Sequence, residues 1–155
     1  MQLTRQKLSP LSDECLVPLF DCSGKCLHNV KGLPTGVRLP QHFCGYDPDA
    51  FLLEADAEEL TPLVFPGDWV VVSPKAPVMS DEVAVLNDGK RFCFRKYSRL
   101  GGMVGFHASA TRFPSWTLQE LTEKGLTVIG RALRVVNREL TRNSSASSTS
   151  QSPST

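Results

Sequence analysis

The sequence has no long apolar run and no strong excess of either charge. No hydrophobic stretch approaches the ~20 residues that a membrane-spanning helix needs, and the first residues lack the apolar core of a signal peptide. The 155 residues include 17 basic and 16 acidic ones, a net charge of +1, which provides no general attraction for nucleic acid or an anionic membrane. We therefore expect a cytoplasmic protein that binds neither membranes nor DNA directly.

The ends of the chain lack the features of folded domains. Residues 1–14 are polar and mixed, and a helix-turn-helix domain needs several times that length, so we interpret them as a flexible arm. Residues 143–155 are rich in Ser and Thr and contain no hydrophobe larger than Ala146, which predicts a disordered tail. The intervening residues 15–142 are expected to form one domain. Five cysteines, an odd number, fit reduced thiols better than a disulfide scaffold.

The central residues carry mainly β-strand patterns. A short apolar run at 16–20, broken by Pro18, predicts an edge strand, and residues 21–48 are rich in Gly and Pro and predict an irregular segment. Asn87 to Lys90 predict a hairpin turn, because Asn, Asp and Gly tolerate the positive φ values of such turns. One helix is expected at 117–124. The remaining strands are predicted at 51–53, 69–72, 82–86, 91–97, 103–107 and 126–136.

These stretches, in their order and spacing, resemble the self-cleaving domain of LexA, UmuD and phage repressors. The similar segments are Phe51 to Val72, Val83 to Val85, Phe92 to Arg95 and Val128 to Ala132. The resemblance implies a mainly β fold of twisted antiparallel sheets. It also implies a Ser-Lys dyad that cuts the chain after a short strand, and a domain that forms dimers.

The sequence lacks the serine and the lysine of the family's dyad. When Pro62 is aligned with the proline that follows the family's serine, the serine falls on Glu59 and the family's lysine falls on Arg95. A one-residue slip would put Glu58 at the serine position. An arginine stays protonated in proteins and cannot act as the base, whereas a lysine can when burial lowers its pKa. Thr61 is the nearest hydroxyl, and Lys96 points to the opposite face of its strand from Arg95.

We therefore predict that no residue of this chain is catalytic and that Glu59 and Arg95 occupy the former dyad positions, where they form an ion pair. Two unrelated surface charges are the alternative interpretation. The family's cleavage site would fall near Ser23 and Gly24, a vestige if the dyad is lost, although Ser-Gly is also ordinary turn composition.

The predicted function is a non-catalytic regulatory and dimerisation module in phage- or stress-linked (SOS-type) transcription control. Its expected partner is a second copy, a related repressor or a polymerase subunit. Residues 126–136 are expected to leave an unpaired apolar strand edge through which the domain dimerises. The alternatives are an active peptidase with an unrecognised nucleophile and a UmuD-like polymerase accessory subunit.

A metal-dependent module is a third possibility. Its ligands would come from the cysteines and histidines between Cys22 and Cys44, although their spacing matches no standard zinc knuckle. We expect no cofactor and no metal. His107 is expected to be structural.

Overall fold

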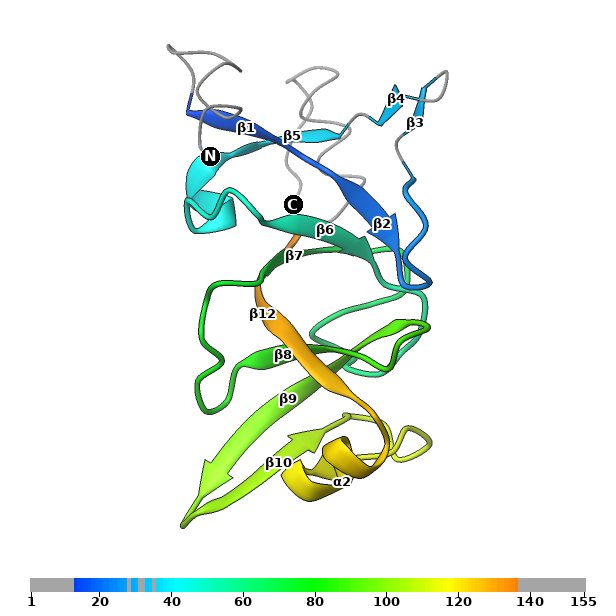
Figure 1. Ribbon diagram of the computed structural model, residues 1–155, viewed down its shortest axis with the longest axis vertical. Helices are drawn as coiled ribbons and strands as arrows, with labels where there is room; N and C mark the ends of the chain where they lie inside the picture. The colour runs from blue at the N-terminus through cyan, green and yellow to red at the C-terminus, as the bar shows by residue number, and fades with distance from the viewer. Residues whose placement is uncertain (1–12, 28, 31–32, 35, 137–155) are drawn as a thin grey trace, which may run out of the picture.

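The computed structural model describes residues 13–27, 29–30, 33–34 and 36–136, and these form a mainly β structure (Figure 1). The predicted tail and residues 1–12 of the predicted arm lie outside the described residues. The elements are β1 (Glu14–Val17), β2 (Leu19–Asp21), β3 (Asn29–Val30), β4 (Leu33–Pro34), β5 (Val37–Pro40), the 3-10 helix η1 (Gln41–Cys44), β6 (Phe51–Glu54), β7 (Trp69–Ser73), β8 (Val83–Asn87), β9 (Phe92–Leu100), β10 (Met103–His107), β11 (Trp116–Thr117), the helix α2 (Leu118–Glu123) and β12 (Thr127–Val136).

Eight of these strands form one sheet in the order β11-β10-β9-β8-β12-β7-β6-β2. Its neighbouring strands are antiparallel except for β2 and β6, which run parallel. Two small sheets, β1-β5 and β3-β4, complete the described structure. Figure 1 shows β1 and β5 at one end of the long axis, and the β9–β10 hairpin with α2 at the other. The predicted mainly β fold class is confirmed.

Several local predictions are confirmed because their signals are short-range. Gly89 adopts a φ of +93° in the turn between β8 and β9, and the Asn87 side chain accepts a hydrogen bond from its N–H at 2.6 Å. The predicted helix is α2, which Thr117 caps through its side chain. The Glu120 carboxylate in turn accepts a hydrogen bond from the Thr117 N–H, so the two residues form a capping box.

Two predictions for the first part of the domain were wrong. The apolar run at 16–20 is not one strand: Pro18 separates β1, which pairs with β5, from β2, which lies at the edge of the large sheet. Residues 21–48 are not wholly irregular, since they contain β5 and η1. Val37 and Leu39 are buried and Arg38 between them is exposed, an alternation that the flanking Gly and Pro residues concealed.

The expectation that residues 126–136 form an edge strand also needs correction, because β12 lies inside the large sheet. Thr127 to Arg131 pair with β8 on one side, and Arg131 to Val136 pair with β7 on the other. Each half of β12 therefore leaves its other backbone edge without a strand among the described residues. Bulges between Val128 and Gly130 and between Ala132 and Arg134 accompany the change of partner.

Three hydrophobic clusters fill the described structure. One joins β1, β5 and η1 to β6 and β7, the second lies among β6, β7, β8 and β9, and the third lies between β8, β10 and α2. The cluster in the middle contains Phe94, and the third contains Cys93 and Tyr97 at its border. Successive residues of β9 thus face two different clusters. Within the part of the chain that the structure describes, no helix is long and apolar enough to cross a membrane.

Candidate functional site

The segment between β6 and β7 folds back on itself and presents Glu59. The Ala55 N–H donates to the Asp68 carbonyl at 2.9 Å, and the Gly67 N–H donates to the Ala55 carbonyl at 2.8 Å, so the two ends of this segment lie together. Leu60 and Val64 are buried in the middle cluster and anchor the segment against the sheet. Because Leu60 is held there, the preceding Glu59 is carried under the protein surface, where only 4% of it is exposed.

Strand β9 supplies Arg95, which is 2% exposed. Arg95 lies opposite Ala84 of β8, and the small alanine leaves room for a long side chain on this face. The Arg95 Nε donates to the Pro114 carbonyl at 2.8 Å, and Nη1 donates to the Phe94 carbonyl at 2.7 Å. Its guanidinium also lies over the Trp116 ring, 4.4 Å from the ring centroid.

The structure brings Glu59 and Arg95 together as a buried ion pair. The Arg95 Nη1 donates to the Glu59 Oε1 at 2.5 Å, and both side chains are almost fully buried. The Phe94 N–H approaches the same carboxylate oxygen at 3.4 Å, whereas Glu59 Oε2 has no hydrogen-bond partner among the described residues. The interpretation of Glu59 and Arg95 as two unrelated surface charges is therefore wrong.

Two opposing effects act on the Glu59 carboxyl. Burial raises its pKa above the ordinary glutamate value, and the hydrogen bond and charge of Arg95 lower it; burial is the larger effect. A buried charge that loses its partner either takes up or releases a proton, or destabilises the fold. Glu59 can take up a proton and become neutral. Arg95 cannot become neutral, because its guanidinium keeps its proton at any pH that proteins survive.

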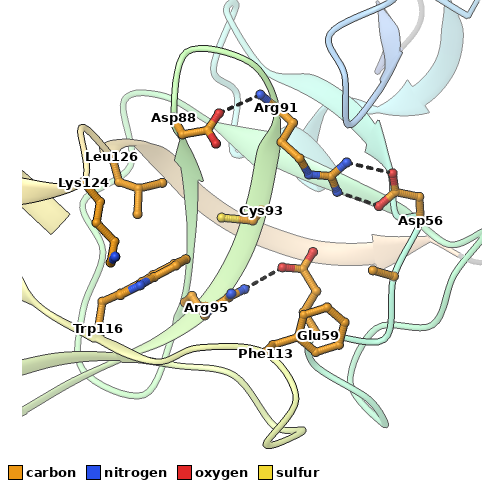
Figure 2. A pocket seen from close by; sticks show the side chains of 11 residues that line it. Asp56, Glu59, Asp88, Arg91, Cys93, Arg95, Phe113, Trp116, Lys124 and Leu126 are labelled. Carbon is orange, nitrogen blue, oxygen red and sulfur yellow. Dashed lines mark hydrogen bonds and ion pairs between the residues drawn. The ribbon is translucent and has the colours of Figure 1, made fainter. Parts of the chain in front are cut away.

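A cavity of about 740 Å³ adjoins the ion pair, and Figure 2 shows the side chains that surround it. Its walls combine two ion pairs, two aromatic rings and one thiol. Arg91 closes one side through two hydrogen bonds to the Asp56 carboxylate at 2.8 and 3.2 Å. The lining residues are Asp56, Ala57, Glu59, Asp88, Arg91, Cys93, Arg95, Phe113, Trp116, Lys124 and Leu126.

The lining set contains no hydroxyl side chain among the described residues, and one thiol, Cys93. Burial raises the pKa of Cys93 to about 11, so its sulfur stays protonated and weakly nucleophilic at neutral pH. Thr61 and Lys96 do not line the cavity. Lys96 is exposed and lies on the opposite face of β9 from Arg95.

Ser23 and Gly24 lie in a turn outside the cavity. The Asp21 carboxylate accepts hydrogen bonds from the Ser23 N–H at 2.9 Å and from the Ser23 hydroxyl at 2.6 Å. Gly24 has a φ of +90°, a conformation that glycine adopts readily. The two residues therefore have the geometry of an ordinary tight turn, and the structure does not bring them to Glu59 or Arg95.

Among the residues that the structure describes, the cysteine and histidine set does not converge either. Cys22 belongs to the middle cluster, and its thiol donates to the Glu54 carbonyl at 3.4 Å. Cys44 belongs to the cluster under β1 and β5, where its sulfur lies 3.5 Å from that of Cys15. His42 packs edge-on against the Phe43 ring, and His28 lies outside the described residues. His107 hydrogen-bonds Ser98 at 2.8 Å on the exposed β9–β10 hairpin.

Sequence reasoning missed several lining residues, above all Trp116 and Lys124. Trp116 stacks on Arg95 because β11 pairs with β10, where Trp116 lies opposite Phe106. Lys124 reaches the cavity because α2 ends there. Neither position carries a sequence signal, since both depend on how β11 and α2 fold back onto β9 and β10.

Comparison with known proteins identifies the family. Residues 24–133 match the family model described as Peptidase S24-like, a stretch that contains both Glu59 and Arg95 and begins at Gly24. No curated protein matches the chain significantly. The matched stretch covers more than half of the 155 residues, so the chain belongs to the Peptidase S24-like family.

Proposed function

We propose that this chain is a non-catalytic member of its family that acts as a regulatory and dimerisation module, in phage- or stress-linked transcription control, through protein–protein contacts. The observation that carries the proposal is the buried contact between Glu59 and Arg95. The sequence resemblance aligns these two residues with the family's serine and lysine. A pair of opposite charges that fills both positions leaves neither a hydroxyl nor a neutral amine there.

The chemistry of the two side chains supports the same proposal. Peptide cleavage by a Ser-Lys dyad needs a base that accepts the serine proton. Arg95 is protonated at all relevant pH values, and its Nε and Nη1 already donate to Pro114, Phe94 and Glu59. The Glu59 carboxylate accepts hydrogen bonds and has no hydroxyl to activate.

The competing proposal is an active peptidase that uses Cys93. It has one observation in its favour, since the thiol lines the same cavity as the ion pair. Activation would require a base that lowers its pKa, but burial raises that pKa to about 11. Lys124 also lines the cavity, but it is an exposed residue, and no hydrogen bond or ion pair among the described residues joins it to Cys93. We therefore favour the non-catalytic module.

For dimerisation, the exposed edges of β12 offer the best surface. Val128 and Val135 are 41% and 39% exposed, and each lies in the half of β12 that has a strand on one side only among the described residues. A strand from a second copy could add hydrogen bonds along such an edge while covering a valine. The dimer stays a prediction, as does the cytoplasmic location.

Intact-mass measurement tests the loss of catalysis. The purified chain should remain one species during prolonged incubation at about pH 10, close to the ordinary lysine pKa of about 10.4, where an active dyad would hold a neutral lysine. Two fragments that join at Ser23 and Gly24 would overturn the proposal. The variant Cys93→Ala serves as the matched control, because any cleavage that it abolishes runs through the thiol.

A further inference from the structure

Two buried polar atoms beside the cavity lack hydrogen-bond partners in the described part of the chain, and they are of opposite kinds. Glu59 Oε2 can only accept a hydrogen bond when ionised, and Trp116 Nε1 can only donate one. Each exposes less than 1 Å² and has no hydrogen-bond partner among the described residues. Both residues line the cavity. Because a buried polar group without a partner is costly, each such atom calls for a physical explanation.

Arg95 fixes the two atoms relative to each other. Its guanidinium bonds the carboxylate of Glu59 at 2.5 Å and lies 4.4 Å from the centre of the Trp116 ring. Figure 2 shows Trp116 and Glu59 on opposite sides of Arg95. An acceptor and a donor thus belong to the two side chains that flank one guanidinium.

We propose that the cavity binds a ligand through an amide group, whose N–H donates to Glu59 Oε2 and whose carbonyl accepts from Trp116 Nε1. In a trans amide the N–H and the carbonyl point in opposite directions, so the group bridges partners roughly 8 Å apart, the sum of two hydrogen bonds and the width of the amide. Simple cations, carboxylates and phosphates fit poorly, since each supplies only donors or only acceptors.

The rest of the cavity suits such a ligand. Phe113 and Trp116 supply aromatic surface, and Leu126 supplies aliphatic surface. Arg91 forms an ion pair with Asp56, so it shapes the cavity wall and does not offer an unpaired charge to a ligand. A cavity of about 740 Å³ lies in the size range of small-molecule sites, which are mostly apolar with a few well-placed polar groups.

Access to the two atoms requires a small movement, and Phe113 is the side chain that would make it. Phe113 lines the same cavity as Glu59. Its segment is held at both ends, by the Ser109 N–H on the Glu59 carbonyl at 2.8 Å and by Arg95 on the Pro114 carbonyl. Between these points Phe113 stacks on Arg112 with the ring centroid 5.1 Å from the guanidinium carbon. Rotation of the Phe113 side chain would widen the cavity that it shares with Glu59 while the backbone stays in place.

The proposal adds a ligand to the non-catalytic module, which by itself needs none. It rests on the proposed function in one respect: the site must not hydrolyse the amide that it binds. A ¹⁵N-labelled full-length chain would be titrated with N-benzylacetamide and, separately, with benzyl acetate, in which an oxygen replaces the N–H. A third titration with N-acetylphenylalanine methylamide distinguishes a peptide source of the amide from a small aromatic one.

The protein has two tryptophans, and they serve as signal and internal control. The Trp116 indole N–H resonance should move downfield and saturate with the amide. The Trp69 resonance should stay in place, because its indole N–H already donates to the Glu54 carboxylate at 3.1 Å. Benzyl acetate should bind about 10-fold more weakly, the usual effect of leaving one buried acceptor unsatisfied.

The variant Trp116→Phe keeps a ring over Arg95 and removes the donor, so it should weaken amide binding about 10-fold as read from the Arg95 backbone resonance. Equal affinity for amide and ester, unchanged affinity in Trp116→Phe, or no saturable shift of the Trp116 resonance would overturn the proposal. The amide–ester comparison uses the wild type and does not depend on a variant that folds. Intact mass of the same samples reports separately on the proposed loss of catalysis.

Discussion

The burial of the Glu59–Arg95 ion pair predicts how much substitution of either residue lowers the free energy of unfolding. Replacing Arg95 with Met, or Glu59 with Leu, keeps the side-chain volume and leaves one buried charge without its partner. Such a loss typically costs about 3–5 kcal/mol, and both residues are nearly inaccessible to water that could compensate. For a domain of this size the melting temperature should fall by roughly 10–15 °C in each single variant.

The double variant Glu59→Leu/Arg95→Met should be far more stable than the sum of the single effects. It removes both charges and leaves an apolar pair of similar volume, an exchange that is often neutral or stabilising. We expect a free energy of unfolding within about 1.5 kcal/mol of the wild type, and hence a coupling energy of about 3 kcal/mol or more. Guanidinium-chloride unfolding of the four proteins measures it.

Glu58 and Arg112 supply a matched control close by. They form an ion pair of 2.7 Å whose side chains are 51% and 63% exposed. Because water screens exposed charges, Glu58→Leu and Arg112→Met should each cost only about 0–1 kcal/mol, with little coupling. The reasoning is refuted if the buried and exposed cycles give the same coupling energy, or if the Glu59 and Arg95 effects are additive.

The two single variants should also respond differently to pH. Without Arg95, the pKa of the buried Glu59 rises further, so the carboxyl stays protonated in the folded state to higher pH. The cost of Arg95→Met should therefore grow as pH rises from mildly acidic to mildly alkaline, since a raised pKa confers stability that is lost as pH rises through it. Glu59→Leu leaves a guanidinium that cannot release its proton, so above the raised Glu59 pKa its cost should be independent of pH.

Three further outcomes are expected. Burial raises the pKa of Cys22 to about 12 and that of Cys93 to about 11, so both thiols should react slowly with iodoacetamide at neutral pH. Their stabilising contribution is complete below about pH 9 and lost toward pH 11 and above, and Cys22→Ala should flatten that alkaline loss in thermal melts. Val135→Glu should weaken the proposed dimer at least 10-fold in sedimentation equilibrium. A wild type that is monomeric, or a variant that dimerises as tightly as the wild type, would contradict the proposed β12 dimer surface. Ser73→Ala removes the 2.5 Å hydrogen bond to the buried Asp47 and should cost about 1–3 kcal/mol in urea unfolding at neutral pH. Although burial opposes it, the hydrogen bond of Ser73 lowers the Asp47 pKa, so that cost should shrink as acid protonates Asp47.

The sequence by itself determined those features that depend on neighbouring residues. Short runs of strand-forming apolar residues set β7, β8 and β10. The Asn87 to Lys90 composition set the hairpin, and Thr117 with Glu120 set the start of α2. The family resemblance and the choice of Glu59 and Arg95 also came from local stretches in a fixed order. Local signals failed where Pro18 and the surrounding glycines and prolines masked the alternation of β1, β2 and β5.

Only the tertiary structure decided what surrounds those two residues. Strand β12 changes partners at Arg131, so it lies inside the sheet while each half keeps one edge without a strand among the described residues. No periodicity encodes which strands become neighbours. Trp116, Phe113 and Lys124 reach the cavity because β10, β11 and α2 fold back over β9. Burial depends on all of these contacts at once. The charges of Glu59 and Arg95 can therefore be read from the sequence, but their depth below the surface and the unpartnered atoms beside them cannot.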